Sequence, residues 1–308
     1  MIIASQPLLG GYGMGLQLFG KNLLRLFKFD LKTHHKAVRE FNNFPQWLDN
    51  LKYEIADEIR TIKLPQVLNP FDSIQTILNS NKSVIRFGDG EFNLILGNSI
   101  GFQKYSPELA QRLTEILMTD DKDILIGIYR FGSLSDINAQ SRAYWRSFMA
   151  RNREKLYPLL DFNRTYINAG LTIFGIEAED HRTDECRAET EKYYNLVRQI
   201  WDGKDITIVK GEGTEVFTHD IYDNAKSVSY IYGPKENAFR EYNRILAEAQ
   251  QLPKDRLIVA ALGPTAKLLA YDLHKQGYRV LDIGHMGKAY DWLKTHKDKI
   301  VAGQFFAA

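Results

Sequence analysis

Residues 257–284 read LIVAALGPTAKLLAYDLHKQGYRVLDIG, and this stretch decides the fold class. The first run, LIVAAL, is aliphatic and too short for a buried helix, which is typical of a strand. Gly263-Pro264-Thr265 then opens an amphipathic helical pattern that ends at Gly277, and RVLDIG follows as a second strand-like run. A strand, a helix and a strand in this order predict one crossover between parallel strands.

The same alternation extends back along the chain. Four further apolar runs are bounded by turn residues and are predicted as strands: SVIRF (83–87), ILIGIY (124–129), ITIVK (206–210) and SVSYIY (227–232). Helices are predicted after Ser106-Pro107, over 236–251 and over 265–276. We therefore predict an α/β fold with a mainly parallel sheet flanked by helices. Ligands in such sheets bind at the carboxyl ends of the strands.

An N-terminal helical extension, residues 1–65, is predicted ahead of a main domain over 66–308, with Pro65 and Pro70 breaking the helical pattern. Residues 16–32 predict an amphipathic helix with a leucine- and phenylalanine-rich face. Its opposite face is basic: Lys21, Arg25, Lys28 and Lys32. Such a helix lies on an anionic membrane surface, or packs on its own domain or a second subunit. Peripheral membrane contact and a homo-oligomer therefore both stay open.

The composition sets limits on partners and location. Of 308 residues, 44% are hydrophobic and 25% are charged, as in ordinary soluble globular proteins. The formal net charge of +2 gives no argument for a nucleic-acid partner. The single cysteine, Cys186, excludes an internal disulfide and a cysteine-rich zinc site, and it fits a cytoplasmic location. The uncharged first twenty residues lack a basic start, so neither a signal peptide nor a spanning helix is expected.

An acidic segment, RFGDGEF (86–92), follows the SVIRF strand. Gly88 permits a tight turn there, so the carboxylates of Asp89 and Glu91 can share one small volume. Two hard oxygen ligands suit magnesium or manganese, which bridge to phosphate oxygens. Arg86 could oppose a phosphate or steady a carboxylate. Taken alone, the triplet fits a plain Asp-Gly turn with a solvated glutamate better than a metal site.

Three more segments follow predicted strands. In KGEGT (210–214), the glycine amides can approach an anion, and the acidic residue could contact a sugar or act as a general base. In LGPTA (262–266), a glycine and a threonine lie at a helix N-terminus, a place for an anion or a ribose hydroxyl. In LDIGH (281–285), the terminal histidine could bind a metal, donate a hydrogen bond to a phosphate or act as a general base. It could also have a purely structural role. The residues singled out are Lys210, Gly211, Glu212, Gly213, Thr214, Gly263, Thr265 and His285.

Together these segments resemble one family. The segments RFGDGEF, GFQKYS, IWDGKDITIVKGEGT, DNAKS, PKENAF (234–239), KDRLIVAALGPTAKLLAYDL and GYRVLDIGH look like the GT-D-type glycosyltransferases, first catalogued as a bacterial domain of unknown function. The similarity covers roughly residues 66–292, in order. The resemblance implies a Rossmann-like fold, a UDP-sugar donor (most simply UDP-glucose), a glycan or glycoconjugate acceptor, and a divalent metal, manganese or magnesium.

Carried onto this sequence, the resemblance assigns roles to residues. The D-x-E signature maps to Asp89 and Glu91, and the terminal histidine, the third metal ligand of this assignment, to His285. Catalytic roles fall to the acidic pair and Glu212. On the nucleotide side the resemblance places Gly211, Gly213, Asn224, Lys226 and Asn237. The motifs themselves add Arg86, Gly88, Lys210, Thr214, Gly263 and Thr265. After the histidine, the acidic residues typical of the family are missing here, and Asp291 is the nearest carboxylate.

The expected function is a metal-dependent transfer of a hexose from a UDP-sugar, in the cytoplasm or on the inner face of the cell membrane. Two other readings use the same residues. A nucleotide or phosphoester hydrolase needs the metal turn but no acceptor pocket, and a nucleotide-binding scaffold held at a membrane needs no turnover. Measuring whether UDP release requires both manganese and an acceptor separates the three.

Overall fold

The structure is a computed structural model that describes residues 63–130, 140–176, 184–213 and 219–295, with isolated positions between 35 and 50. The chain divides into two units, Met1–Ile62 and Lys63–Ala308, and the helices and strands below all lie in the second. The predicted amphipathic helix over 16–32 lies outside the described residues.

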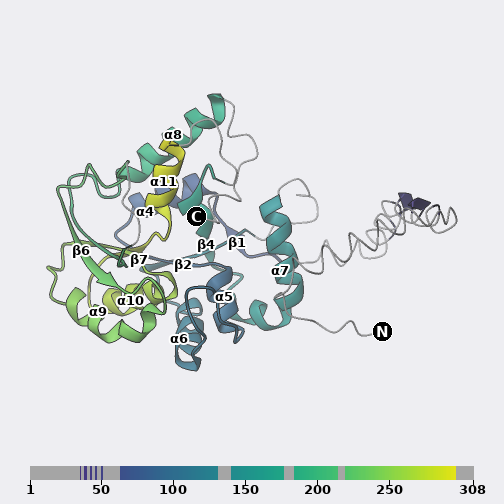
Figure 1. Ribbon diagram of the computed structural model, residues 1–308, viewed down its shortest axis with the longest axis horizontal. Helices are drawn as coiled ribbons and strands as arrows, with labels where there is room; N and C mark the ends of the chain where they lie inside the picture. The colour runs from purple at the N-terminus through teal and green to yellow at the C-terminus, as the bar shows by residue number, and fades with distance from the viewer. Residues whose placement is uncertain are drawn as a thin grey trace, which may run out of the picture. The chain divides into compact units, whose positions relative to one another are not determined.

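One sheet of eight parallel strands organises the second unit, in the order β1-β4-β3-β2-β8-β7-β5-β6 (Figure 1). This confirms the α/β class and the parallel sheet. The strands are β1 Gln66–Val67, β2 Ser83–Phe87, β3 Ile124–Ile128, β4 Thr165–Asn168, β5 Asp205–Gly211, β6 Ser227–Gly233, β7 Leu257–Ala261 and β8 Val280–Asp282. Every strand predicted from an apolar run is present, whereas β1 and β4 were not predicted.

Helices cover both faces of the sheet. In Figure 1, α4, α8 and α11 lie on one side and α5, α6, α9 and α10 on the other. The α-helices are α4 Pro70–Leu78, α5 Asp89–Ile95, α6 Pro107–Leu117, α7 Gln140–Leu156, α8 Asp184–Arg198, α9 Tyr242–Ala249, α10 Gly263–Lys275 and α11 Met286–Thr295. Short 3-10 helices are η1 Tyr157–Leu159, η2 Ala169–Ile173 and η3 Ala238–Glu241.

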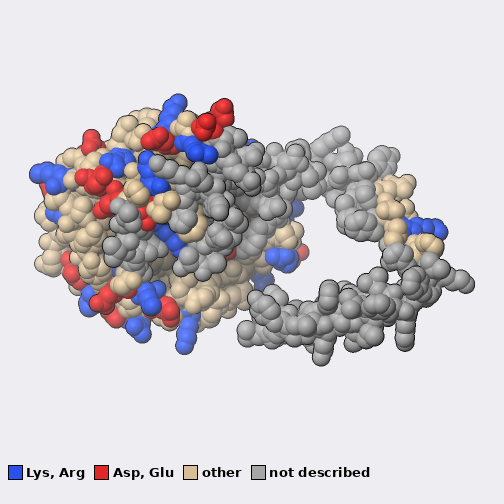
Figure 2. Space-filling model, turned by 45° about the horizontal axis from the view of Figure 1, so that its top comes forward, with Lys and Arg blue, Asp and Glu red and all other residues tan. Residues whose placement is uncertain are grey.

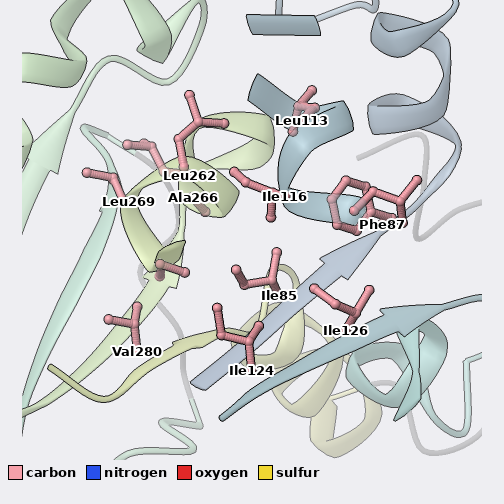
Figure 3. Packing of buried hydrophobic residues seen from close by; sticks show 14 of the residues in the cluster. Ile85, Phe87, Leu113, Ile116, Ile124, Ile126, Leu262, Ala266, Leu269 and Val280 are labelled. Atoms are coloured by element: carbon pink, nitrogen blue, oxygen red, sulfur yellow. The ribbon is translucent and has the colours of Figure 1, made fainter. Parts of the chain in front are cut away.

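A core of aliphatic side chains joins the sheet to α6 and α10 (Figure 3). Ile85 and Val280 point from β2 and β8 toward Ile116 of α6 and Ala266 of α10, and all of them are fully buried. Each buried isoleucine or valine contributes roughly 1.5–3 kcal/mol. This packing fixes where α10 begins relative to the ends of β2 and β8.

Local sequence explains where the helices begin. α6 starts as predicted, because the Ser106 hydroxyl accepts a hydrogen bond from the Leu109 amide and a proline occupies the first helical position. The helix predicted over 236–251 is shorter than expected. Asn237 has a left-handed backbone (φ 53°), so a 3-10 turn follows it and α9 begins only at Tyr242.

Charges are mixed on the surface. Figure 2 shows acidic and basic side chains interspersed on the face in view, in keeping with the small net charge. Among the described residues, none of the helices combines the length and apolar character that crossing a membrane requires.

The two halves of the sheet meet where β2 lies beside β8. From β2 the chain proceeds outward through β3 to β4, and the other half runs from β8 through β7 and β5 to β6. Such a reversal of strand order opens a crevice at the carboxyl ends of the strands.

Candidate active site

The acidic segment forms the first turn of a helix and not the isolated tight turn that we predicted. Asp89 is the first residue of α5, and Gly88 is its N-cap. Glu91 at the third position accepts a hydrogen bond from the Gly88 amide (Oε2 to N, 2.8 Å), which is the half of a capping box that a glycine N-cap can form. Asp89 is exposed and Glu91 is buried, so the two carboxylates have different surroundings.

A cleft of about 960 Å3 opens at the carboxyl ends of β2, β5, β7 and β8. This volume lies at the upper end of the range for small-molecule sites. The predicted site residues that line the cleft are Arg86, Gly88, Asp89, Glu91, Lys210, Gly211, Gly263 and His285. The structure therefore brings together residues from all four segments that we singled out.

Arg86 braces the base of the cleft. Its Nε donates to the Asp282 carbonyl oxygen (2.8 Å), and one terminal nitrogen donates to the Ala169 carbonyl oxygen (2.8 Å). The other terminal nitrogen lies 3.4 Å from the Asp282 carboxylate. Of the two roles predicted for Arg86, the contacts match the steadying of a carboxylate.

Asp282 is a buried carboxylate at the end of β8. Burial opposes its ionisation, but the charges of Lys267 and Arg86 and a hydrogen bond from the Arg86 amide outweigh burial and lower its pKa. Lys267 of α10 is one of the cleft residues that sequence reasoning missed. It lines the cleft and pairs with Asp282 (3.1 Å) and Glu91 (3.0 Å).

His285 stands between β8 and α11, at the mouth of the cleft. Its side chain is exposed and lines the cleft. Partial desolvation by the surrounding protein and the charges of Arg86, Lys288 and Lys267 lower its pKa to about 4. The imidazole is therefore neutral at neutral pH and can offer a lone pair or an N–H.

The KGEGT segment only partly faces the cleft. Lys210 and Gly211, which end β5, line it. Glu212 is exposed just beyond, and its amide donates to the Gly233 carbonyl oxygen (2.7 Å), extending the β5–β6 ladder. Gly213 has φ 68° and is exposed. Thr214 lies outside the described residues.

The N-terminus of α10 contributes Gly263 to the cleft, with φ 53°. Thr265 is fully buried two residues further along, and its hydroxyl has no hydrogen-bond partner. It does not line the cleft, so a ligand contact by Thr265 stays a prediction.

Asn224 and Lys226 lie just before β6, at the amino-terminal ends of the strands. Asn224 donates to the Arg198 carbonyl oxygen and to Asp202, each at 3.0 Å, and Lys226 pairs with Asp205 at 3.1 Å. Because the cleft is at the carboxyl ends of the strands, these two residues do not line it.

Asn237 acts on the loop beside the cleft. Its amide donates to the Phe102 carbonyl oxygen (2.8 Å), and its side-chain oxygen accepts from the Lys104 amide (2.8 Å). Phe102 and Gln103 line the cleft, whereas Asn237 does not. Its contacts hold a wall of the site, and direct nucleotide contact by Asn237 remains a prediction.

Residues 84–305 match the family model described as the glycosyltransferase GT-D fold. The chain belongs to the GT-D family of glycosyltransferases. This confirms the resemblance seen in the sequence, and the strand-end cleft of this GT-D chain holds Asp89 and Glu91, to which the resemblance assigns the D-x-E signature.

Known relatives agree with this assignment. The chain is 33% identical to the probable glycosyl transferase Gly of Streptococcus gordonii over 293 residues, and 30% identical to the glycosyltransferase GlyD of Streptococcus pneumoniae serotype 4 over 252 residues. These matches cover 89% and 78% of this chain but only 40% and 30% of those proteins. The chain thus spans less than half the length of either relative.

Solved structures show the same fold. One is the domain of unknown function 1792, described as having a distinct glycosyltransferase fold, with 31% identity and a TM-score of 0.71 over 79% of this chain and 87% of that one. Another is a glycosyltransferase from Streptococcus sanguinis, with 30% identity and a TM-score of 0.68 over 77% and 87%.

Aromatic side chains line the open end of this GT-D cleft. Tyr230 and Tyr232 of β6 are stacked (centroids 5.7 Å apart) and are 41% and 44% exposed. The aromatic side chains Trp145 and Phe148 of α7 are buried in the core, so they do not offer a ring at the cleft surface.

The carboxylates of Asp89 and Glu91 differ in how accessible they would be to a metal. Asp89 presents an exposed carboxylate at the cleft, which suits a hard divalent cation that takes its other ligands from phosphates and water. Both oxygens of Glu91 are engaged by protein groups. Among the described residues, no three His, Cys, Asp or Glu side chains are grouped to hold an ion. Of the acidic pair, Asp89 is the residue whose exposure at the cleft would suit a metal bound together with a diphosphate.

Proposed function

We propose that the chain transfers a hexose, with glucose as the first candidate, from a UDP-sugar to a glycan or glycoconjugate acceptor, with help from manganese or magnesium. The observation that carries this proposal is the shared cleft. It gathers an exposed carboxylate, Asp89, a lysine, Lys210, and a helix N-terminus, Gly263, around one volume of about 960 Å3. Membership of the GT-D family makes glycosyl transfer the chemistry to test first.

The donor diphosphate would lie between β5 and α10. The Lys210 ammonium and the amides at the start of α10 favour an anion there. Asp89 would hold the metal, and the neutral His285 is the second candidate ligand. When bound, the metal would neutralise charge on the departing diphosphate. Glu212, exposed beside the cleft, is the group we propose to deprotonate the acceptor hydroxyl.

The acceptor would enter past Tyr230 and Tyr232. Exposed aromatic faces at the rim of a cleft can pack against the C–H faces of sugar rings, and their hydroxyls can donate hydrogen bonds. Residues 16–32 would hold the chain at the inner face of the cell membrane through their basic face. Deleting residues 1–32 should then weaken binding to anionic lipid vesicles, and unchanged partitioning would count against this contact.

The test is a UDP-release assay on the full chain. UDP-glucose is compared with UDP-galactose, UDP-N-acetylglucosamine and GDP-mannose, with and without Mn2+, against mono- and disaccharide acceptors. Release of UDP that requires both metal and acceptor supports transfer. Release at the full rate without acceptor indicates a hydrolase, and donor binding without turnover indicates a scaffold.

Asp89→Asn should lower the rate at least about 100-fold, because one charged metal contact is lost at the reacting diphosphate. Glu115→Gln is the matched control, since Glu115 is an exposed carboxylate on α6 that does not line the cleft. Equal rates for Asp89→Asn and wild type would remove Asp89 from the proposed machinery.

A further inference from the structure

Lys267 lies on the inward face of α10, and its side chain is only 6% exposed. Its ammonium nitrogen is 3.0 Å from Oε1 of Glu91, 3.1 Å from Oδ2 of Asp282 and 3.3 Å from the carbonyl oxygen of Gly263. An ammonium group has three protons to donate, and three protein oxygens surround this one. Its hydrogen-bonding capacity is therefore filled from within the fold.

Glu91 is equally committed. Oε2 accepts from the Gly88 amide at 2.8 Å, and Oε1 meets Lys267, so each carboxylate oxygen has a protein partner. The first of these bonds fixes the N-terminus of α5, and the second ties that end to α10. Glu91 thus connects two helices whose first turns both border the cleft.

The surrounding charges are balanced. Arg86 and Lys267 carry two positive charges, and Glu91 and Asp282 carry two negative charges, all in the closely packed base of the cleft. Buried charges are tolerated when each is paired, and removing one partner leaves the other uncompensated. A divalent cation on Glu91 would displace Lys267 or sit close to its ammonium, and either arrangement upsets this balance.

Asp89 has different surroundings. Both carboxylates line the cleft, but Asp89 is exposed there whereas Glu91 is buried. Residues two apart on a helix do not share a face, which is consistent with this difference.

We propose that the two acidic residues have separate tasks, and that Lys267 is the positioning residue that separates them. Asp89 meets the metal and diphosphate, whereas Glu91 is held by Lys267 and sets the position of the α5 N-terminus without binding metal. This inference rests on the proposed function for its metal half. It concerns a divalent cation bound together with a nucleoside diphosphate.

The first test measures Mn2+ binding in the presence of UDP, by electron paramagnetic resonance of the free ion and by calorimetry. Asp89→Asn should weaken Mn2+ binding at least about tenfold, whereas Glu91→Gln should change it by less than about threefold. Glu115→Gln again serves as the control. Loss of affinity in Glu91→Gln as large as that in Asp89→Asn would overturn the division of tasks.

The second test uses Lys267→Met, whose expected effect a general loss of structure would not produce. Without the ammonium, Glu91 is released and the local field becomes more negative, so Mn2+ should bind severalfold more tightly while turnover falls. Adding Glu91→Gln to Lys267→Met should abolish that gain. Weaker Mn2+ binding in Lys267→Met, in a sample whose calorimetric stoichiometry shows the same folded fraction as wild type, would contradict the proposal.

A third measurement separates this inference from the proposed function. Thermal unfolding of the metal-free single and double variants at positions 91 and 267 forms a double-mutant cycle. The double variant should melt higher than the sum of the two single losses predicts, because it removes one charge of each sign. Additive losses would refute the positioning role even if transfer is confirmed. Wild-type protein that binds neither UDP nor Mn2+ would instead refute the proposed function, and the metal half of this inference with it.

Discussion

Arg86 on β2 and Asp282 on β8 are joined through both backbone and side chain. The Arg86 amide donates to Oδ2 of Asp282 (3.0 Å), its Nε donates to the Asp282 carbonyl oxygen (2.8 Å), and a terminal nitrogen lies 3.4 Å from Oδ1. These contacts fall where the two halves of the parallel sheet meet. Arg86 and Asp282 thus hold β2 and β8 together at the base of the cleft, and both side chains are charged.

Asp282→Asn should lower the free energy of unfolding by about 3 kcal/mol, because it leaves Arg86 and Lys267 with a single buried counter-charge. Urea unfolding followed by circular dichroism measures this change. The control is Asp223→Asn, which removes the partner of Arg198 from an exposed ion pair and should cost less than about 1 kcal/mol. Equal losses of unfolding free energy in the two variants would show that the buried Asp282 carboxylate stabilises the fold no more than an exposed ion pair does.

The main elements of the fold could be predicted because their signals are local. Aliphatic runs such as LIVAAL and SVIRF end at glycine-containing turns, and both form strands at the predicted residues, with β7 ending one residue early. β4 was missed because its sequence, TYIN, is short and half polar, and β1 has only two residues. Their pairing depends on neighbouring strands that no local pattern encodes.

The cleft could be anticipated only in part. The motifs each follow a strand, and the carboxyl ends of parallel strands lie at the same end of a sheet. This explains why Asp89, Lys210 and His285 converge. Lys267 escaped notice because a lysine within AKLLAYDL is ordinarily read as a solvated charge. Tyr230 and Tyr232 escaped because their exposure depends on β6 being an edge strand, which is a property of the whole sheet.

Gly263→Ala should weaken UDP binding. Gly263 has φ 53°, and a β-carbon there would lie 2.8 Å from the Phe102 ring, which lines the cleft. Gly277→Ala is the matched control, because Gly277 has φ 85° but open space around it and lies beyond the other end of α10. Both variants should lose about 1 kcal/mol of stability through backbone strain. Only Gly263→Ala should raise the Kd for UDP in calorimetry, and a matching rise in Gly277→Ala would implicate general strain.

Tyr232→Ala should raise the KM for the sugar acceptor found in the UDP-release assay by about 2- to 10-fold, with the KM for the donor unchanged. The expected cause is the loss of an exposed ring at the open end of the cleft, where stacking contributes about 0.5–1.5 kcal/mol. Tyr105→Ala is the control, since Tyr105 is similarly exposed but does not line the cleft. A rise in the donor KM alone would place the nucleobase, not the acceptor, against this ring.

His285 should make the metal-free protein less stable in mild acid. Partial desolvation and neighbouring positive charges lower its folded-state pKa to about 4, whereas an unfolded histidine titrates near about 6.5. As the pH falls below about 6.5, the unfolded chain takes up this proton before the folded one does, so stability falls until the pH reaches about 4. His285→Gln should therefore flatten the decline in melting temperature between pH 6.5 and pH 4. The same decline in the variant as in wild type would assign the acid sensitivity to other groups.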